Sequence, residues 1–147
     1  EKTVGGYYLC PSCLARGVVL PPGRPTLHLA SVSLLPLYLG SDLLSRVDIA
    51  AAAAGIIERY ERTGRLTTTP DGTRTVGYDF GLFLFTLTEL GHPRAERVYR
   101  HLLDVRDATG AWVEYYDDDR PVGCPCRPYE SGINLEAALH FAATRPI

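Results

Sequence analysis

The sequence predicts an all-α protein, a segment of an α/α toroid made of antiparallel helical hairpins with long loops at one end. Two patterns in its 147 residues indicate this fold. Helical segments alternate between apolar on all sides and apolar on one face, as expected for an inner and an outer layer of helices. The connections alternate too: those at Gly40 and Gly91 are short, whereas those at 14–26, 64–77 and 107–132 are long.

The alternation of connections predicts where the functional residues lie. Short connections join helices that lie antiparallel to each other. The three inner helices then run parallel, and each long loop leads into the N-terminal end of an inner helix. The long loops therefore share one face of the molecule. Loops on a rigid scaffold usually carry the binding and catalytic residues.

Composition and charge limit the class of protein. Apolar residues make up 46% and charged residues 22% of the chain, which suits one domain over residues 1–147. The net charge of −2 gives no electrostatic reason to expect nucleic acid or an anionic membrane as a partner. No apolar run reaches the roughly 20 residues of a membrane span. The chain contains no methionine, so we expect a fragment or processed product, the C-terminal part of an α/α barrel.

The first hairpin follows an irregular, cysteine-containing segment over residues 1–26, and the hairpins together span 27–143. Thr26 is placed to cap an inner helix over 27–39, which Pro36 should kink or end early. Ser41 caps a second helix that runs from Asp42 to about Thr63. That helix is apolar on one face, so it belongs to the outer layer, and Gly64 suits its end.

The second hairpin begins after a turn. Threonine-rich arms flank Pro70-Asp71-Gly72, which predicts a small β-hairpin over 66–76. An inner helix is expected over 78–90 and an outer helix over 94–106, opened by Pro93.

The longest loop separates these helices from the last inner one. Residues 107–132 contain a strand-like stretch over 111–116 and an acidic turn at 117–119. The last apolar helix is expected to start at Ser131 or Asn134.

Three motifs stand at the starts of the second and third inner helices and between them. They are Gly-Tyr-Asp-Phe-Gly-Leu at 77–82, Thr-Gly-Ala-Trp-Val-Glu-Tyr-Tyr at 109–116 and Arg-Pro-Tyr-Glu-Ser-Gly-Ile-Asn-Leu-Glu-Ala at 127–137. In these motifs the chain resembles the six-hairpin glycosidases, the (α/α)6 barrels that include trehalases, processing glucosidases and glucoamylases. As architecture, the resemblance covers residues 26–143.

The resemblance implies a glycoside hydrolase that needs no cofactor for catalysis and takes a carbohydrate as its partner. In trehalase-like members an aromatic-Glu-x-Tyr stretch carries the catalytic base, and Glu114 with Tyr116 matches it. A complete barrel has six hairpins, and this chain supplies only about two and a half. We therefore expect the missing N-terminal part of the barrel, or another protein chain, to cover its flanks.

Glu114 is the leading catalytic candidate. In inverting hydrolysis a carboxylate activates water while an acid protonates the leaving oxygen. The neighbouring Trp112 and Tyr116 suit stacking against sugar rings. The alternative is a surface strand, on which Trp112, Glu114 and Tyr116 would share one face.

Other polar residues precede inner helices and have two interpretations each. Asp79 would act as the acid or hold sugar hydroxyls, or it simply complements the helix dipole. Glu130 would contact substrate or anchor the loop, and Glu136 needs a partner if it is buried. The predicted substrate-binding set is Tyr78, Trp112, Tyr116, Arg127, Tyr129 and Glu130.

The four cysteines form two close pairs, and three states remain open for them. Cys10, Cys13, Cys124 and Cys126 resemble a four-cysteine structural zinc site, although the second pair is tighter than usual. Disulfides and free buried thiols are the alternatives. Zinc binding would fit a second hypothesis for the whole chain, a non-catalytic helical-hairpin interaction module. His28 and His140 are expected to be core residues.

Overall fold

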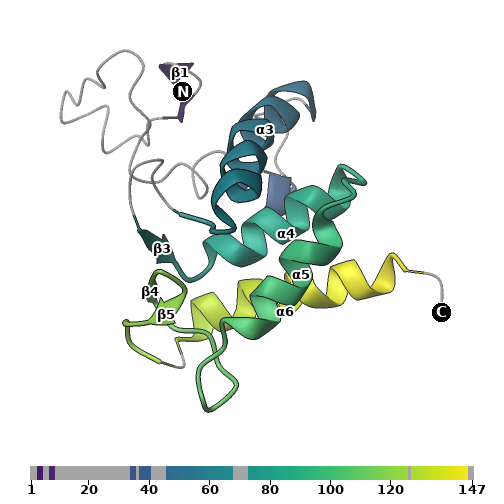
Figure 1. Ribbon diagram of the computed structural model, residues 1–147. Helices are drawn as coiled ribbons and strands as arrows, with labels where there is room; N and C mark the ends of the chain where they lie inside the picture. The colour runs from purple at the N-terminus through teal and green to yellow at the C-terminus, as the bar shows by residue number, and fades with distance from the viewer. Residues whose placement is uncertain are drawn as a thin grey trace.

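A computed structural model describes residues 3–4, 7–8, 34–35, 37–40, 46–67, 73–125 and 127–145. This part of the chain is mainly helical and carries a small three-stranded sheet (Figure 1). None of its helices is long and apolar enough to cross a membrane. Its elements are β1 (Thr3–Val4), β2 (Tyr7–Tyr8), α3 (Arg46–Thr63), β3 (Arg74–Val76), α4 (Asp79–Glu89), α5 (Ala95–Asp104), β4 (Tyr115–Asp117), β5 (Arg120–Pro121) and α6 (Pro128–Ala143).

Helices α4 and α6 lie side by side and run parallel, as predicted for inner helices (Figure 1). Near their N-terminal ends, the Gly81 amide donates to the Asn134 side chain at 2.7 Å. Further along both helices, the Phe85 ring stacks on His140 with centroids 4.7 Å apart. Almost every residue of α4 is buried, whereas α6 leaves Leu135 and Leu139 more than half exposed. These leucines agree with the apolar flank expected on the last inner helix.

Helices α3 and α5 both contact α4 and run antiparallel to α4 and α6. Arg46, at the start of α3, donates to the carbonyl oxygen of Glu89 at the end of α4. Glu96, in the first turn of α5, pairs with Arg145 just beyond α6. The glycines that follow α3 and α4 adopt positive φ, 72° at Gly64 and 60° at Gly91, a conformation that suits a helix C-terminus.

The predicted helix bounds agree with α4 and α5, and the last helix starts earlier than expected. Helix α6 begins at Pro128 instead of Ser131 or Asn134, because the fixed φ of proline suits a first helical turn. Most of the inner helix predicted over 27–39 lies outside the described residues. Where the structure describes that segment, Leu34 is fully buried and the Tyr38 ring meets Phe85 at 5.2 Å.

The β-hairpin predicted over 66–76 is wrong in its pairing. Strand β3 pairs antiparallel with β4, with Thr75 opposite Tyr116, while Leu66 is in no strand and accepts a hydrogen bond from the Thr75 hydroxyl. Tyr116 explains the pairing, because its buried ring packs against Phe80 of α4 at 5.3 Å and so places β4 beside β3. Residues 68–72 of this segment lie outside the described ones.

Strands β4 and β5 form a hairpin with a two-residue turn. Asp118 and Asp119 occupy it with φ of 49° and 64°, as a type I′ turn requires. Two of the three long loops, 64–77 and 107–132, therefore meet in one sheet at the N-terminal end of α4, which confirms their predicted shared face. The third loop, 14–26, lies outside the described residues.

Candidate functional site

The backbone of Glu114 is fixed from both sides by the two loops. Its N–H donates to the Cys124 carbonyl at 3.1 Å, and its carbonyl accepts from the Gly77 amide at 2.8 Å. Neither neighbouring glycine leaves room for a side chain. A Cβ at Gly77 would collide with the Val113 carbonyl oxygen, and one at Gly123 would lie 2.8 Å from the Cβ of Glu114. The position of Glu114 is therefore set by backbone contacts that only glycine permits.

Arg127 joins Glu114 to Glu130. Its Nη1 pairs with Oε1 of Glu114, and its Nε lies 3.6 Å from Oε2 of Glu130. The hydrogen bond to Glu114, followed by the charges of Glu114 and Glu130, raises the pKa of Arg127 above its usual value. Arg127 and Glu114 therefore form an ion pair at the loop end. It places a permanent positive charge beside the candidate base.

The two carboxylates differ in their access to solvent. The side chain of Glu114 is 26% exposed, whereas that of Glu130 is only 3% exposed. Among the described residues, Oε2 of Glu130 has no hydrogen-bond partner, because 3.6 Å is an ion-pair distance and too long for a hydrogen bond. Glu114 is thus the carboxylate that a ligand can reach, and Glu130 is the buried one that Arg127 compensates.

Two tyrosines lie at the same end of the inner helices. The rings of Tyr78 and Tyr129 meet edge to face, with centroids 5.2 Å apart. Tyr78 directly precedes α4, and Tyr129 is in the first turn of α6 with 53% of its surface exposed. Tyr129 therefore offers an aromatic surface to solvent close to Arg127 and Glu130 in the sequence and in space.

Three predicted site residues are packed inside the molecule. Asp79 is completely buried in the first turn of α4. Trp112 is buried and donates from Nε1 to the Leu102 carbonyl at 2.8 Å. Tyr116 is completely buried, accepts a hydrogen bond from the Val113 amide, and has its pKa raised to about 12, chiefly by burial. The sugar stacking predicted for Trp112 and Tyr116 needs correction, because the core covers both rings.

Glu136 is exposed, and the hydroxyl of Tyr38 donates to its carboxylate. His140 is partly buried and pairs with Glu89 at 2.8 Å. Neither residue belongs to the group around Glu114.

The predicted zinc site falls mostly outside the described residues. Cys10, Cys13 and Cys126 are among the residues whose structure is not described, and Cys124 is exposed and free. Within the described ranges, no group of three or more histidine, cysteine, aspartate or glutamate side chains is arranged to hold a metal ion. Zinc binding by the four cysteines stays a prediction.

A second polar group was not predicted from the sequence. The Tyr60 hydroxyl lies 3.0 Å from Nδ1 of His101, and Nε2 of the same ring lies 3.1 Å from Oδ2 of Asp119. The three residues come from α3, α5 and the β4–β5 turn. The acidic turn at 117–119 is conspicuous in the sequence. Nothing in the sequence marks His101 as its partner, because His101 lies in an ordinary amphipathic helix.

Comparison of the chain with protein-family models, with curated proteins and with solved structures gives no match. The likeness to the six-hairpin glycosidases rests on the motifs at 77–82, 109–116 and 127–137. All three map to one end of the inner helices, since the first opens α4, the second leads into β4 and the third opens α6.

Proposed function

We propose that this chain carries part of the active site of an inverting glycoside hydrolase, with Glu114 as the general base. One observation supports the proposal above the others. Residues from the three family-like motifs converge, so that Arg127 links Glu114 to Glu130 and the Tyr129 ring lies beside Tyr78. This group combines a partly exposed carboxylate, a fixed cation and an exposed aromatic ring, which is the chemistry that hydrolysis of a sugar bond requires.

In the proposed reaction, Glu114 takes a proton from a water molecule. The oxygen of that water forms a bond to the anomeric carbon while the bond to the leaving oxygen breaks. A second carboxyl group gives its proton to the leaving oxygen, so the configuration at the anomeric carbon is inverted. Arg127 pairs with Glu114 and so orients the carboxylate that takes the proton.

The acid is the less defined partner. Asp79 is the candidate in this chain, because it heads the inner helix α4. Its complete burial means that it reaches a substrate only if the side chains around it part. The alternative is an acid supplied from outside this chain, about 6.5–9.5 Å from Glu114, which leaves space for the sugar and the water.

Glu114→Gln in the full-length protein tests the proposal, with α-glucosides and related oligosaccharides as substrates. The amide keeps the shape of the side chain and cannot take a proton, so kcat should fall by several orders of magnitude with little change in KM. Glu89→Gln is the matched control, because Glu89 ends α4 at the end far from the loops that hold Glu114. Near-normal hydrolysis by the Glu114 variant would end the proposal.

A second experiment separates catalysis from a supporting role of Glu114. Shortening the side chain in Glu114→Ala leaves room for a small nucleophile such as azide. Azide should restore cleavage and yield a glycosyl azide of inverted configuration, because it attacks from the position of the water. A variant that is inactive only because its loop has moved would not respond to azide.

The runner-up function is a non-catalytic helical-hairpin module with a structural zinc site. The exposed leucines of α6, Leu135 at 52% and Leu139 at 62%, favour it, because they suit contact with another protein chain or the rest of a barrel. If four cysteines bind the metal, the full-length protein should hold one zinc ion per chain and Cys124→Ser should lose it. The same variant should keep any hydrolytic activity that Glu114 supports.

A further inference from the structure

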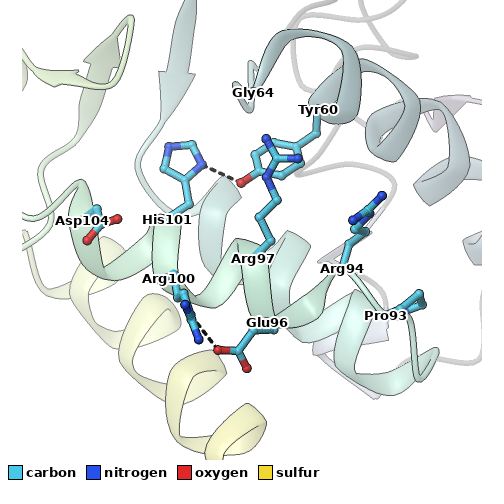
Figure 2. A pocket seen from close by; sticks show the side chains of 9 residues that line it. All are labelled: Tyr60, Gly64, Pro93, Arg94, Glu96, Arg97, Arg100, His101 and Asp104. Atoms are coloured by element: carbon cyan, nitrogen blue, oxygen red, sulfur yellow. Dashed lines mark hydrogen bonds and ion pairs between the residues drawn. The ribbon is translucent and has the colours of Figure 1, made fainter.

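A cavity of about 550 Å³ opens between the end of α3 and one face of α5 (Figure 2). Both helices belong to the outer layer, so this cavity is built from different residues than the group around Glu114. The residues that matter for its chemistry are Tyr60, Gly64, Arg94, Arg97, Arg100 and His101. Its volume falls in the range of pockets that hold small molecules, about 300–1,000 Å³.

Arg94, at the N-cap of α5, and Arg97 and Arg100 within the helix are spaced three residues apart and therefore lie along one side of it. Two of them already have exposed carboxylate partners. Arg94 pairs with Glu61 at 2.6 Å, and Arg100 pairs with Glu96 at 2.8 Å. Ion pairs of this kind are weak, because water competes for both charges. Either arginine can therefore exchange its carboxylate partner for an anion of higher charge.

Arg97 is the exception among the three. Its guanidinium lies over the Tyr60 ring, with Cζ 5.2 Å from the centroid, and no carboxylate of the described residues forms an ion pair with it. Gly64 lies at the edge of the cavity, where a Cβ would make an ordinary contact of 3.9 Å with Nη2 of Arg97. Figure 2 shows Arg97 beside Tyr60 at the centre of the cavity, between Arg94 and His101.

Three arginines and two carboxylates, Glu96 and Asp104, line the cavity. Glu96 is engaged by two arginines, Arg100 from its own helix and Arg145 from beyond α6. Asp104 is exposed at the other end of α5.

Hydrogen bonds on the side away from Arg97 hold the Tyr60 ring in place. Its hydroxyl bonds to Nδ1 of His101, whose Nε2 bonds to Asp119, and the Tyr60 side chain is 3% exposed. In the neutral ring this arrangement has Nε2–H donating to Asp119 while Nδ1 accepts from the Tyr60 hydroxyl. The pair of bonds fixes the plane of the tyrosine ring, and with it the platform on which the Arg97 guanidinium rests.

We propose that this cavity binds a small molecule through a phosphate monoester group. Arg97 supplies two parallel N–H donors that match two phosphate oxygens, and Arg94 and Arg100 add charge from either side. A dianionic group suits three neighbouring arginines better than a carboxylate, which carries a single charge. The volume exceeds that of a phosphate alone, so the rest of the ligand lies beside it in the same cavity.

Titration calorimetry of the full chain with glycerol phosphate tests this site. Binding should weaken as salt concentration rises, because the contact is between exposed charges. Arg97→Ala should weaken binding by more than tenfold, and Arg97→Lys should weaken it less, because lysine keeps the charge and loses the planar pair of donors. Arg62→Ala is the matched control, since Arg62 lies in the last turn of α3 outside the cavity, and its affinity should equal that of the unmodified chain.

The other possible results of this titration would contradict the phosphate site. Equal affinity of Arg97→Ala, Arg97→Lys and the unmodified chain would overturn the proposal, as would equal binding of glycerol or acetate. The ligand should also shift the ring C–H resonances of His101 in an NMR titration, and shifts confined to other parts of the chain would refute the location. Circular dichroism establishes that each variant is folded, and Arg97→Lys keeps the test valid if the alanine variant is not.

Discussion

Helix α4 contacts its inner neighbour and its outer neighbours in two different ways. Near the loop end, α4 meets α6 through glycine backbone: Asn134 accepts from the Gly81 amide at 2.7 Å and donates to the Gly77 carbonyl at 2.9 Å, and a ring contact between Phe85 and His140 follows only further along the helices. Against α3 and α5 the contact is made by rings, with Phe83 5.9 Å from Tyr60 and Phe80 5.4 Å from His101. The glycine contact leaves no space and fixes the loops that hold Glu114. The ring contacts keep the outer helices apart and leave room for a cavity.

The two regions also differ in charge. At the loop end a single arginine, Arg127, serves two carboxylates. In the outer cavity three arginines line the same space, and Arg97 lies on a tyrosine ring instead of a carboxylate. The two regions therefore differ in the balance of charge that they offer to a ligand.

The largest effect is expected where the inner helices touch. A Cβ at Gly81 would lie 2.6 Å from Oδ1 and 2.9 Å from Cα of Asn134, so Gly81→Ala must push α4 and α6 apart and break their hydrogen bond. We expect a loss of about 4 kcal/mol in the free energy of unfolding, measured by urea titration. Gly132→Ala is the control on α6, because nothing lies within 4 Å of its Cβ. It should stabilise the protein by about 1 kcal/mol, and equal effects of both substitutions would contradict the close contact.

The buried tyrosine of the loop end should make stability depend on pH above neutrality. The pKa of Tyr116 rises from 10.0 to about 12 on folding, so its contribution is fully present below pH 10 and is lost as pH rises to about 12. Two pKa units correspond to about 3 kcal/mol. Tyr116→Phe should lower stability at neutral pH, because the Val113 amide loses its acceptor, and should flatten the decline between pH 10 and 12. An unchanged slope in that window would show that other groups cause it.

Removal of Arg127 should have a smaller effect, again confined to the loop end. Arg127→Met leaves the 3%-exposed Glu130 without its cation, so the urea midpoint should fall. Arg74→Met is the matched control, because Arg74 pairs with Asp117 at the surface of the same sheet and its loss should hardly move the midpoint. If both variants unfold alike, the pair at Glu130 is no stronger than a surface ion pair.

The smallest effects should come from the turn that touches the outer layer. Asp118 and Asp119 both have positive φ, so glycine at either position relieves strain of roughly 1 kcal/mol. Asp118→Gly loses only an exposed pair with Arg65, and stability should stay within about 0.5 kcal/mol of the original. Asp119→Gly also loses the contact to His101, so it should be the less stable of the two in thermal unfolding. The reverse order would mean that His101 gains nothing from Asp119.

The sequence predicts those parts of the fold that depend on local patterns. Periodicity located α4 and α5 to within a few residues, and the glycines at 64 and 91 marked the ends of α3 and α4. The pairing of β3 with β4 was missed because strands of two or three residues carry no periodic signal, and the nearer arm at 66–69 competes as a partner.

In the candidate site, too, some contacts could be predicted from local sequence and others could not. The Arg127–Glu114 contact was predictable because both residues lie on one loop next to an inner helix. The burial of Trp112 and Tyr116 was not, since alternation along a strand tells which residues share a face and leaves open which face is covered. The Tyr60–His101 contact joins residues 41 positions apart that have no motif in common.

The pairing of β3 with β4 has a consequence for the order of folding. The β4–β5 hairpin closes through a two-residue turn, an event that takes microseconds in small peptides. Strand β3 joins it only after the chain has closed a loop that contains α4 and α5, because Arg74 and Asp117 are 43 residues apart. Closing such a loop costs entropy, which the packed helical hairpin must first offset. The bond from Gly77 to Glu114 closes the same loop, so the backbone support of Glu114 forms late, together with the tertiary structure.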